Sequence, residues 1–584
     1  MEVRGKEEEA MGAQRELGEW LKNPSAEERA RELERVQAKM HSPPYLMHKF
    51  WARRPWTVFR RIIGDFTRPC SIILDPFAGG GVTLVEGLIL RRKVVAVDLN
   101  PLATFIMRHE VAPLDITKFK KAVERIKASL EPVMNELYRV KCPKCDSNAV
   151  AEWTEYVGEH PVLIKLRCGC GFHGTKVPED SDMSLFSTEA YKEIYKEIPI
   201  VRIPEGEKTR DLLKRGYKYF HELFSVRNLT ALALLRREIL AESDTEVRNF
   251  LRFTLSSTLK WASKLSHRRG EIVEGWAMHA FWVYPRWLEI NVWRQFLRRV
   301  DAVIRGKTYT NKYIGNYAVE ARDFEELERG DATYMIIEGD ARKIPLPDES
   351  IDAVITDPPY GGNVNYAELS DYFLWFDGKL APKSEEIIIN RARGLSLSEY
   401  ERGLSEVFRE CYRVLKDESP LISTFNSKDM RIVAAFITAL RQAGFKYVAT
   451  SCQPYLKVYE TTFHALQVDA MPFDFVFIFR KSDKKCAKRQ ESNLSEILHE
   501  LREKLEECKK EKATEREFRE RTYPYLIDYI VNFSIEDARI LAEEYEYMIK
   551  RERKHFSKIR KEVVKRRMSK NEQAIPTGFD GKGS

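Results

Sequence analysis

The sequence lacks several features that would assign it to common protein classes. No apolar run approaches the length of a membrane helix, which argues against an integral membrane protein. The first forty residues are charged and predicted to be helical, so we expect no secretory signal peptide and a cytoplasmic location. The net charge of +8 is small for 584 residues and favours an anionic partner only weakly. No internal repeat and no nuclease signature are evident.

Cysteine is also scarce, and its distribution is uneven. Nine cysteines are too few for a disulfide framework in a chain of this size. Four of them form two close pairs on turns, as a tetrahedral structural zinc site requires. His173 could replace one of them, and a site that has lost its metal is the alternative. The predicted zinc ligands are Cys142, Cys145, Cys168 and Cys170.

The most informative segment is Asp357-Pro358-Pro359-Tyr360. It follows an apolar run over 351–356 with the β-branched content of a buried parallel strand. The acid and the prolines therefore lie at the carboxyl end of that strand, where open α/β sheets bind ligands. Two consecutive prolines make a stiff turn with outward carbonyls. A carboxylate, carbonyls and an aromatic face suit the exocyclic amino group of a flat heterocycle, although ordinary strand-end turns share this composition.

A second pattern, over 71–90, reads as a strand, a glycine turn and an amphipathic helix. The next apolar strand, over 94–97, ends at an acid, which typically bonds ribose hydroxyls in such units. The third glycine of a dinucleotide fingerprint is missing, so adenosine on a non-phosphate group fits better than a pyrophosphate. S-adenosylmethionine is the natural candidate. The predicted cofactor contacts here are Asp75, Pro76, Phe77, Ala78, Gly79, Gly81, Asp98 and Asn100.

Two further segments are predicted to contact the cofactor. An apolar strand runs into Gly339-Asp340-Ala341, which places Asp340 to accept from the adenine amino group and Ala341 to offer its backbone N–H. Residues 41–56 precede the glycine turn, and we interpret them as packing over the methionine end of the cofactor. An aromatic-rich linker is the alternative. The candidate contacts in this stretch are Lys49, Phe50 and Trp51.

A second x-P-P-Y tetrapeptide, Ser42-Pro43-Pro44-Tyr45, lies in the same stretch. It follows a charged helical run over 26–40 rather than an apolar strand. Without a strand end the geometry for catalysis is missing, so we do not expect this tetrapeptide to be catalytic.

These segments resemble those of amino-methyltransferases that act on nucleic-acid bases. The resemblance rests on DPFAGGG, VAVDLNP, GDARKIPLPD and TDPPYGGNVNYAELSDYFLWF, with W-A-R-R-P at 51–55 and N-Y-A-E-L-S-D at 365–371. The chain is most similar to the zinc-ribbon family usually described as adenine-specific DNA methylases. Some archaeal relatives of that family methylate cytosine N4 in ribosomal RNA. The resemblance covers roughly 41–110 and 332–480.

The resemblance implies an α/β fold: a Rossmann-like, doubly wound, seven-stranded methyltransferase sheet with a large inserted zinc-ribbon and helical domain. We expect a monomer. The predicted parts are a charged helical N-terminal segment (1–40), the two parts of the methyltransferase domain (41–111 and 332–481), the inserted recognition domain (112–331, with the zinc ribbon at 141–175), a charged helical C-terminal region (482–570) and a disordered tail (571–584).

The expected chemistry is methylation of an exocyclic base amine. The Asp357 side chain and the Pro358 carbonyl would accept its two hydrogens and stabilise the developing positive charge. Pro359 stiffens the turn, and Tyr360 would stack on a base that is flipped out or already unpaired. In-line attack on the sulfonium methyl then requires mainly positioning. The candidates for lining the base pocket are Asn363, Asn365 and Tyr366.

The substrate is less well specified. Segments 259–271 and 279–299 interleave tryptophan and tyrosine with arginine and lysine, which suits either unpaired nucleic acid or core packing. We expect some of these arginines to contact phosphate and most of the tryptophans to be core residues. The sequence slightly favours cytosine N4 in structured ribosomal RNA, with adenine N6 or cytosine N4 in DNA as the alternative. The rivals are a non-catalytic nucleic-acid binder and a small-molecule methyltransferase or nicotinamide enzyme.

Overall fold

The computed structural model describes residues 25–39, 41–180, 182, 197–454, 473–482 and 493–562. The chain divides into two compact units, 39–400 and 1–38 with 401–584. The predicted domain boundaries follow a different division of the chain and stay predictions, and the tail predicted to be disordered (571–584) lies outside the described residues.

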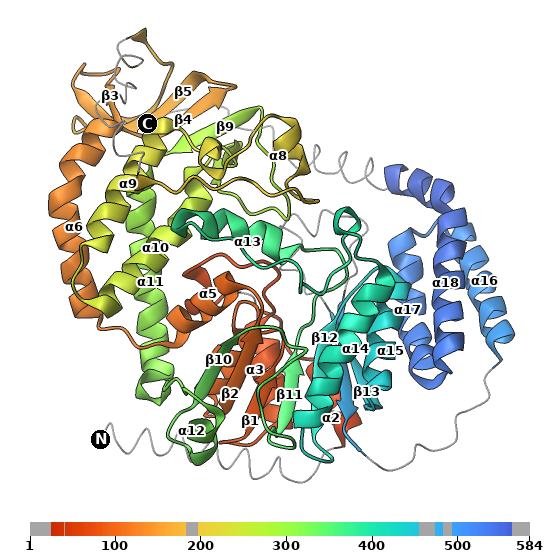
Figure 1. The fold of residues 1–584 in the computed structure, drawn as a ribbon. Coiled ribbons are helices and arrows are strands. Elements are labelled where there is room, and N and C mark those ends of the chain that lie inside the picture. Colours follow the sequence, from red (N-terminus) through yellow and green to blue (C-terminus); the bar gives the residue numbers. More distant parts are fainter. Residues whose placement is uncertain are drawn as a thin grey trace, which may run out of the picture. The chain divides into compact units, whose positions relative to one another are not determined.

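Seven strands form one sheet in the order β10-β2-β1-β11-β12-β14-β13 (Figure 1). Strands β10, β2, β1 and β11 are parallel, whereas β14 runs antiparallel to both of its neighbours. The predicted seven-stranded α/β sheet is therefore confirmed, as a mixed sheet. The strands are β1 (Ile72–Asp75), β2 (Lys93–Asp98), β10 (Tyr334–Glu338), β11 (Ala353–Thr356), β12 (Pro420–Phe425), β13 (Lys446–Pro454) and β14 (Phe473–Arg480).

The central strands are buried along their whole length because helices follow them in the chain and cover the sheet. All four residues of β1 and of β11 are buried, as expected for parallel strands of an α/β sheet. Gly81, with φ +79°, begins the helix after β1, and a Cβ there would meet the Met107 side chain at 2.8 Å. The helices of this part are α3 (Trp56–Phe66), α4 (Val82–Ile89), α5 (Pro101–Val111), α13 (Tyr366–Leu374), α14 (Leu397–Val414) and α15 (Met430–Gln442).

Between β2 and β10 the chain forms a helical bundle and a second, antiparallel sheet. One hydrophobic core joins α6, α9, α10 and α11 to α5, α13 and residues 47–51, so this region packs as part of the unit 39–400. The helices are α6 (Ile116–Leu137), α8 (Arg210–Lys214), α9 (Val226–Leu240), α10 (Thr245–Ala262), α11 (Val292–Tyr313) and α12 (Phe324–Arg329).

The antiparallel sheet carries the cysteine pairs. Its strands are β3 (Arg139–Lys141), β4 (Asn148–Val157), β5 (His160–Arg167) and β6 (His173–Lys176), and β9 (Arg286–Ile290) pairs with β4. A short separate ribbon is formed by β7 (His267–Arg269) and β8 (Ile272–Glu274). The sequence predicts a mostly helical region after the zinc ribbon, so the strand β9 differs from that prediction.

Most aromatic and basic side chains of 259–299 have internal partners. Trp287 and Trp293 are 3% exposed, as core packing predicts. Arg268 and Arg286 both bind Glu155 at 3.0 Å. Trp282 is more exposed, at 37%, and its ring lies beneath the Arg215 guanidinium.

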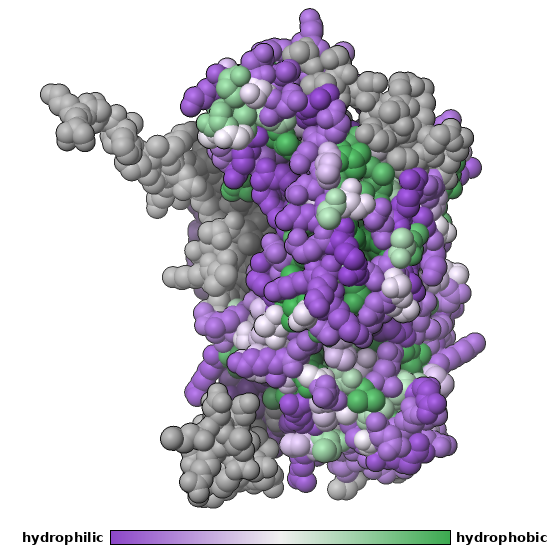
Figure 2. All heavy atoms as spheres, turned by 90° about the vertical axis from the view of Figure 1, so that its left-hand side faces the viewer, coloured by the Kyte–Doolittle hydropathy of each residue, from purple (hydrophilic) through white to green (hydrophobic). Residues whose placement is uncertain are grey.

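The outer surface beside the bundle is polar. Helix α6 carries exposed charged residues such as Lys120, Lys121 and Glu124, and the face shown in Figure 2 is predominantly hydrophilic, with small separate hydrophobic areas. Among the residues that the structure describes on that face, the hydrophobic areas are thus too small and separate to form a large apolar docking patch.

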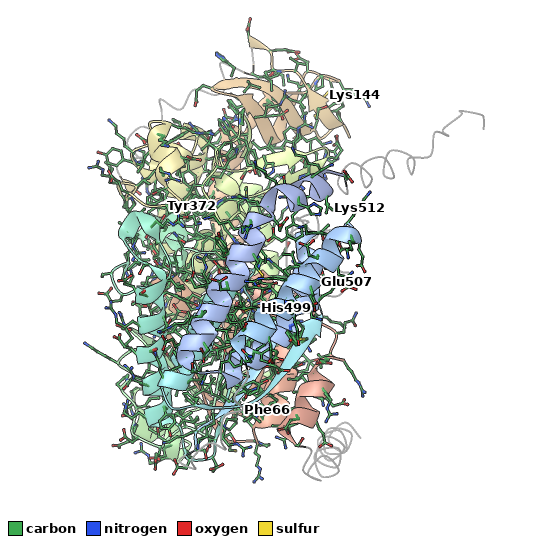
Figure 3. All side chains as sticks on the ribbon, turned by 90° about the vertical axis from the view of Figure 1, so that its right-hand side faces the viewer. Phe66, Lys144, Tyr372, His499, Glu507 and Lys512 are labelled. Carbon is green, nitrogen blue, oxygen red and sulfur yellow. The ribbon has the colours of Figure 1, made fainter. Side chains whose placement is uncertain are left out.

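The unit 1–38 with 401–584 contains four further helices that have buried faces. They are α2 (Ala26–Leu33), α16 (Leu494–Lys510), α17 (Glu515–Asn532) and α18 (Ile535–Arg551). Phe518, Tyr523 and Tyr545 are fully buried between them, so these charged helices are amphipathic rather than merely solvated. Figure 3 labels His499, Glu507 and Lys512, which are exposed on or just after α16.

Candidate active site

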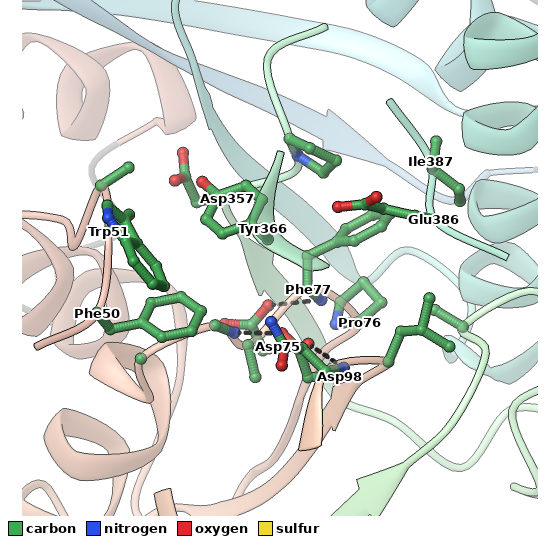
Figure 4. Close-up of a pocket in the computed structure, with 18 of the residues that line it drawn as sticks. Phe50, Trp51, Asp75, Pro76, Phe77, Asp98, Asp357, Tyr366, Glu386 and Ile387 are labelled. Atoms are coloured by element: carbon green, nitrogen blue, oxygen red, sulfur yellow. Dashed lines mark hydrogen bonds between the residues drawn. The ribbon is translucent and has the colours of Figure 1, made fainter. Parts of the chain in front are cut away.

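One pocket lies at the carboxyl ends of β1, β2, β10 and β11 (Figure 4). The glycine turn and Asp357 line it together, although they are far apart in the sequence. It is closed by the segment before α3 and by residues 382–388. The predicted site residues that line this pocket are Phe50, Trp51, Asp75, Pro76, Phe77, Ala78, Gly79, Asp98, Asn100, Asp340, Ala341, Asp357, Pro359 and Tyr366.

Six predicted residues do not line the pocket. Gly81 begins α4, and Pro358 is buried behind the turn. Asn363 is exposed, whereas Asn365 is fully buried and only weakly bonded to Glu368, at 3.4 Å. Of the three residues predicted to line a base pocket, only Tyr366 lines the pocket described here. The other two residues outside the lining set are Lys49 and Tyr360.

Asp98 is held by the backbone of the glycine turn. Its two carboxylate oxygens accept from Gly79 N–H at 2.7 Å and from Asn100 N–H at 2.8 Å. Burial raises the pKa of Asp98 to about 6 despite these bonds. A half-buried carboxylate with spare lone pairs at a strand end suits a ligand that brings hydroxyl donors.

Asp75 links the two central strands beneath the pocket. Its Oδ1 accepts from the Thr356 hydroxyl at 2.7 Å and from Phe77 N–H at 3.1 Å. Burial raises the pKa of Asp75 to about 7. Because Thr356 directly precedes Asp357, this bond fixes the strand end that presents Asp357 to the pocket.

Asp357 is bound on both of its oxygens by neighbouring side chains. Arg54 Nε donates to Oδ2 at 2.7 Å, and the Tyr360 hydroxyl donates to Oδ1. The Arg54 guanidinium also lies 4.7 Å from the centroid of the Tyr360 ring. The Tyr400 hydroxyl donates to the Pro359 carbonyl at 2.6 Å and so anchors the proline turn.

Arg54 and Tyr400 were not predicted as parts of this site. Arg54 lies in the W-A-R-R-P segment, but of that segment only Trp51 was predicted to contact a ligand. Tyr400 lies 41 positions after Pro359, and no local pattern marks it. Glu386 was also missed; it lines the pocket and accepts from Ala367 N–H at 3.0 Å.

The aromatic wall of the pocket comes from both ends of the unit. Phe50 stacks on Tyr366 with 5.8 Å between ring centroids and 19° between planes. Burial and the charge of Asp357 raise the pKa of Tyr366, so its hydroxyl stays protonated. The Trp51 indole donates to the Met278 carbonyl at 3.3 Å, which ties the wall to the bundle.

Two arginines in or beside the pocket form ion pairs with acidic side chains. Arg342 lies 2.8 Å from Asp340 and binds the carboxylate predicted to accept from adenine. Arg53 lies 2.6 Å from the buried Glu110.

The second x-P-P-Y tetrapeptide is structural, as its position in the sequence suggested. It enters the short 3₁₀ helix η1 (Pro44–Leu46) rather than following a strand. Tyr45 is buried, and its hydroxyl donates to Glu86 at 2.6 Å. It therefore has no access to the pocket.

The four predicted zinc ligands meet at one end of the antiparallel sheet. Their sulfur atoms all lie within 4.8 Å of one another, and the Cys142–Cys170 and Cys145–Cys168 sulfur distances are both 3.7 Å. Four thiolates about 2.3 Å from a tetrahedral zinc ion would lie about 3.8 Å apart, so the donor set fits zinc. The alternative ligand His173 instead lies 3.3 Å from Glu152.

Comparison with known proteins gives matches to DNA-modifying enzymes. A family model described as DNA methylase matches residues 5–105, which include the glycine turn. The type II methyltransferase M.MjaII of Methanocaldococcus jannaschii is 23% identical over 379 residues, covering 61% of this chain and 67% of that protein. The type II methyltransferase M.MvaI of Kocuria varians is 22% identical over 188 residues, covering 28% and 41%.

Among solved structures, a DNA modification methylase from Thermus thermophilus in complex with S-adenosyl-L-methionine is 19% identical. The match covers 28% of this chain and 57% of that one, with a TM-score of 0.16. The present chain thus spans only part of its relatives. Within the described residues, no helix has both the length and the apolar composition needed to cross a bilayer.

Proposed function

We propose that this protein transfers a methyl group from S-adenosylmethionine to the exocyclic amino group of a base in DNA. The observation that carries the proposal is the shared pocket, in which the glycine turn with Asp98 faces Asp357 at the ends of adjacent parallel strands. The glycine turn and Asp98 suit an adenosyl group, and Asp357 suits an amine. The matching family model and the named relatives support the same class of reaction.

The chain's own residues supply binding and charge rather than a covalent step. Asp98 would accept from the ribose hydroxyls, and Phe77 to Gly79 would pass close beneath the adenosyl group. Bound S-adenosylmethionine supplies an electrophilic methyl group on a sulfonium. Asp357 would accept from the target amine and stabilise its developing charge, and Phe50 and Tyr366 would exclude water.

The comparisons favour DNA over the ribosomal RNA that the sequence analysis slightly preferred. The matching family model is described as DNA methylase. Adenine N6 and cytosine N4 present the same amine chemistry to Asp357, so we propose either of these products. The cytoplasmic location and the monomeric state expected from the sequence stay predictions.

Mass spectrometry of nucleosides tests this proposal directly. The protein is incubated with methyl-deuterated S-adenosylmethionine and either unmethylated genomic DNA or total RNA, and both are digested to nucleosides. We expect labelled N6-methyladenine or N4-methylcytosine in DNA. Label in RNA alone would restore the ribosomal alternative, and no label in either polymer from a cofactor-binding protein would refute the activity.

We also propose that the four-cysteine cluster holds a structural zinc ion, because the sulfur spacing matches a tetrahedral Zn–S₄ site. Elemental analysis of the purified protein is expected to give one zinc per chain, lost in Cys142→Ser. Metal removal is expected to lower the melting temperature, while S-adenosylmethionine still binds. A metal-free protein of unchanged melting temperature would contradict this.

A further inference from the structure

Residues 42–55, the bridging segment, separate two environments. One side lines the pocket through Phe50 and Trp51. The other side packs on the bundle, where His48 Nε2 lies 3.0 Å from Ser256 Oγ on α10 and Arg299 of α11 donates to the Met47 carbonyl at 3.0 Å. The side facing the bundle has no part in the pocket described above.

Three cations belong to the elements that meet on this side. Lys49 follows His48, which contacts Ser256; Lys260 lies one helical turn after Ser256 on α10; and Arg299 of α11 bonds Ser257. Arg299 Nε donates to Ser257 Oγ at 3.2 Å, and the Lys260 ammonium lies 4.8 Å from the centroid of the Trp261 ring. Among the described residues, no carboxylate forms an ion pair with any of the three. The arrangement is a partly buried positive cluster without a counter-ion.

The positive charges of this cluster repel one another. Burial lowers the pKa of Lys49 to about 8, and the neighbouring Lys260 is the next cause. Burial also lowers the pKa of Lys260 to about 8 and that of Arg299 to about 10, with Arg299 acting on Lys260. Glu274 is the acid that acts on Lys260, but its carboxylate is 3.2 Å from His267.

Several other buried cations of the molecule have acidic partners, whereas Arg92 and Lys307 are bonded to backbone carbonyls. Lys176 lies 2.7 Å from Asp182, and Arg519 lies 2.8 Å from Glu546. Arg299 is bonded to the Leu46 and Met47 carbonyls and to Ser257, but among the described residues no carboxylate balances the charge of the cluster. A bound anion would stabilise all three cations at once. The bridging-segment cluster therefore has the charge of a binding site for an anion.

We propose that Lys49, Lys260 and Arg299 form an oxyanion site beside the pocket, and that this site binds the backbone phosphate next to the target base. The assignment to phosphate rests on the proposed function, because the methylated polymer supplies it. Lys49 directly precedes Phe50, which lines the pocket, so an anion held here lies beside a base held there. The half-buried Trp261 offers a ring face to a neighbouring base.

The carboxylate of S-adenosylmethionine is the other source of such an oxyanion, and it is the ligand that the sequence analysis assigned to Lys49. Lys49→Gln and Lys260→Gln are compared with Lys121→Gln, which removes the same charge from the exposed side of α6. For each variant, affinity is measured for a mixed-sequence 20-nucleotide single-stranded DNA at several salt concentrations. Affinity for S-adenosylmethionine is measured separately by calorimetry.

The expected result is a loss of about tenfold in DNA affinity at 0.1 M salt for both cluster variants. The slope of log K against log salt should fall by about 0.7, the value for one phosphate of a single strand. Affinity for S-adenosylmethionine and the behaviour of Lys121→Gln should not change. Lys49→Arg should keep DNA affinity, because it keeps the charge.

Melting temperature gives a second measurement that does not depend on a ligand. Lys49→Met and Lys260→Met should melt at or above the wild-type temperature, whereas a purely structural role would lower it. Loss of cofactor affinity with unchanged DNA affinity would assign the site to the carboxylate and overturn the phosphate proposal, as would no change in either. If the variants lose DNA affinity as expected but the wild-type protein yields no methylated nucleoside, only the proposed function would be refuted.

Discussion

The two sides of the bridging segment differ in whether their positive charges are paired with carboxylates. On the pocket side Arg53 is paired with Glu110 and Arg54 with Asp357, at 2.6 and 2.7 Å. On the side facing the bundle, Lys49 and Arg299 have no acidic partner among the described residues. Acids dominate where a sulfonium and an amine are proposed to bind, and cations dominate where a phosphate is proposed. Neighbouring residues can thus serve ligands of opposite charge.

Removing the Asp357 carboxylate should have the largest effect on the function of the pocket side. We expect Asp357→Ala to lower the rate of methyl transfer by about 10³-fold, because a fixed acceptor for the reacting amine is lost. Affinity for S-adenosylmethionine should stay within a few-fold of wild type. Asp340→Ala is the matched control, with the opposite pattern of weaker cofactor binding. Normal methylation by Asp357→Ala would show that the assigned roles are wrong.

Glu110→Gln would make the pocket side resemble the side facing the bundle. It leaves Arg53 buried without its carboxylate, and we expect a loss of about 3 kcal/mol in the free energy of unfolding. Chemical denaturation measures this loss, with Lys49→Met as the comparison that should lose nothing. Equal stability of Glu110→Gln and wild type would mean that the pair is dispensable.

Arg54→Gln should sharpen the comparison by releasing Asp357 while the carboxylate stays. We expect about a tenfold fall in kcat, because Asp357 loses the guanidinium that orients it. Arg54→Lys should fall in between, since an ammonium lacks the planar fork. Combining Arg54→Gln with Asp357→Ala should add no further loss, and an additive loss would show that Arg54 acts independently of Asp357.

Asp75→Asn should have an effect that is visible as a change of stability with pH. The folded state keeps the Asp75 proton up to about pH 7, whereas the unfolded chain loses it near pH 4. The stability due to this proton is complete below pH 4 and falls as the pH rises to 7. The wild-type stability should therefore decline relative to Asp75→Asn by up to about 1.4 kcal/mol per pH unit, measured by thermal unfolding. Parallel pH curves would contradict the shifted pKa.

The sequence predicted the sheet edge well because its signals are local. Strand polarity alone placed Asp98 and Asp357 at one edge, and positive φ at Gly79 and Gly81 fits the glycine turn. The same reasoning failed where a contact depends on the tertiary fold. Arg54 meets Asp357 across 303 positions, and β9 joins β4 although its own sequence suggests a helix as readily as a strand.

The wall formed by Phe50 and Trp51 has a consequence for how the protein is made. These residues leave the ribosome early, but Trp276, Tyr366 and Phe373, which cover them, are translated much later. Until then the nascent chain carries two aromatic rings that lack these partners. Such a chain is exposed to aggregation during synthesis, so slow translation or truncation before 366 should create a demand for chaperones.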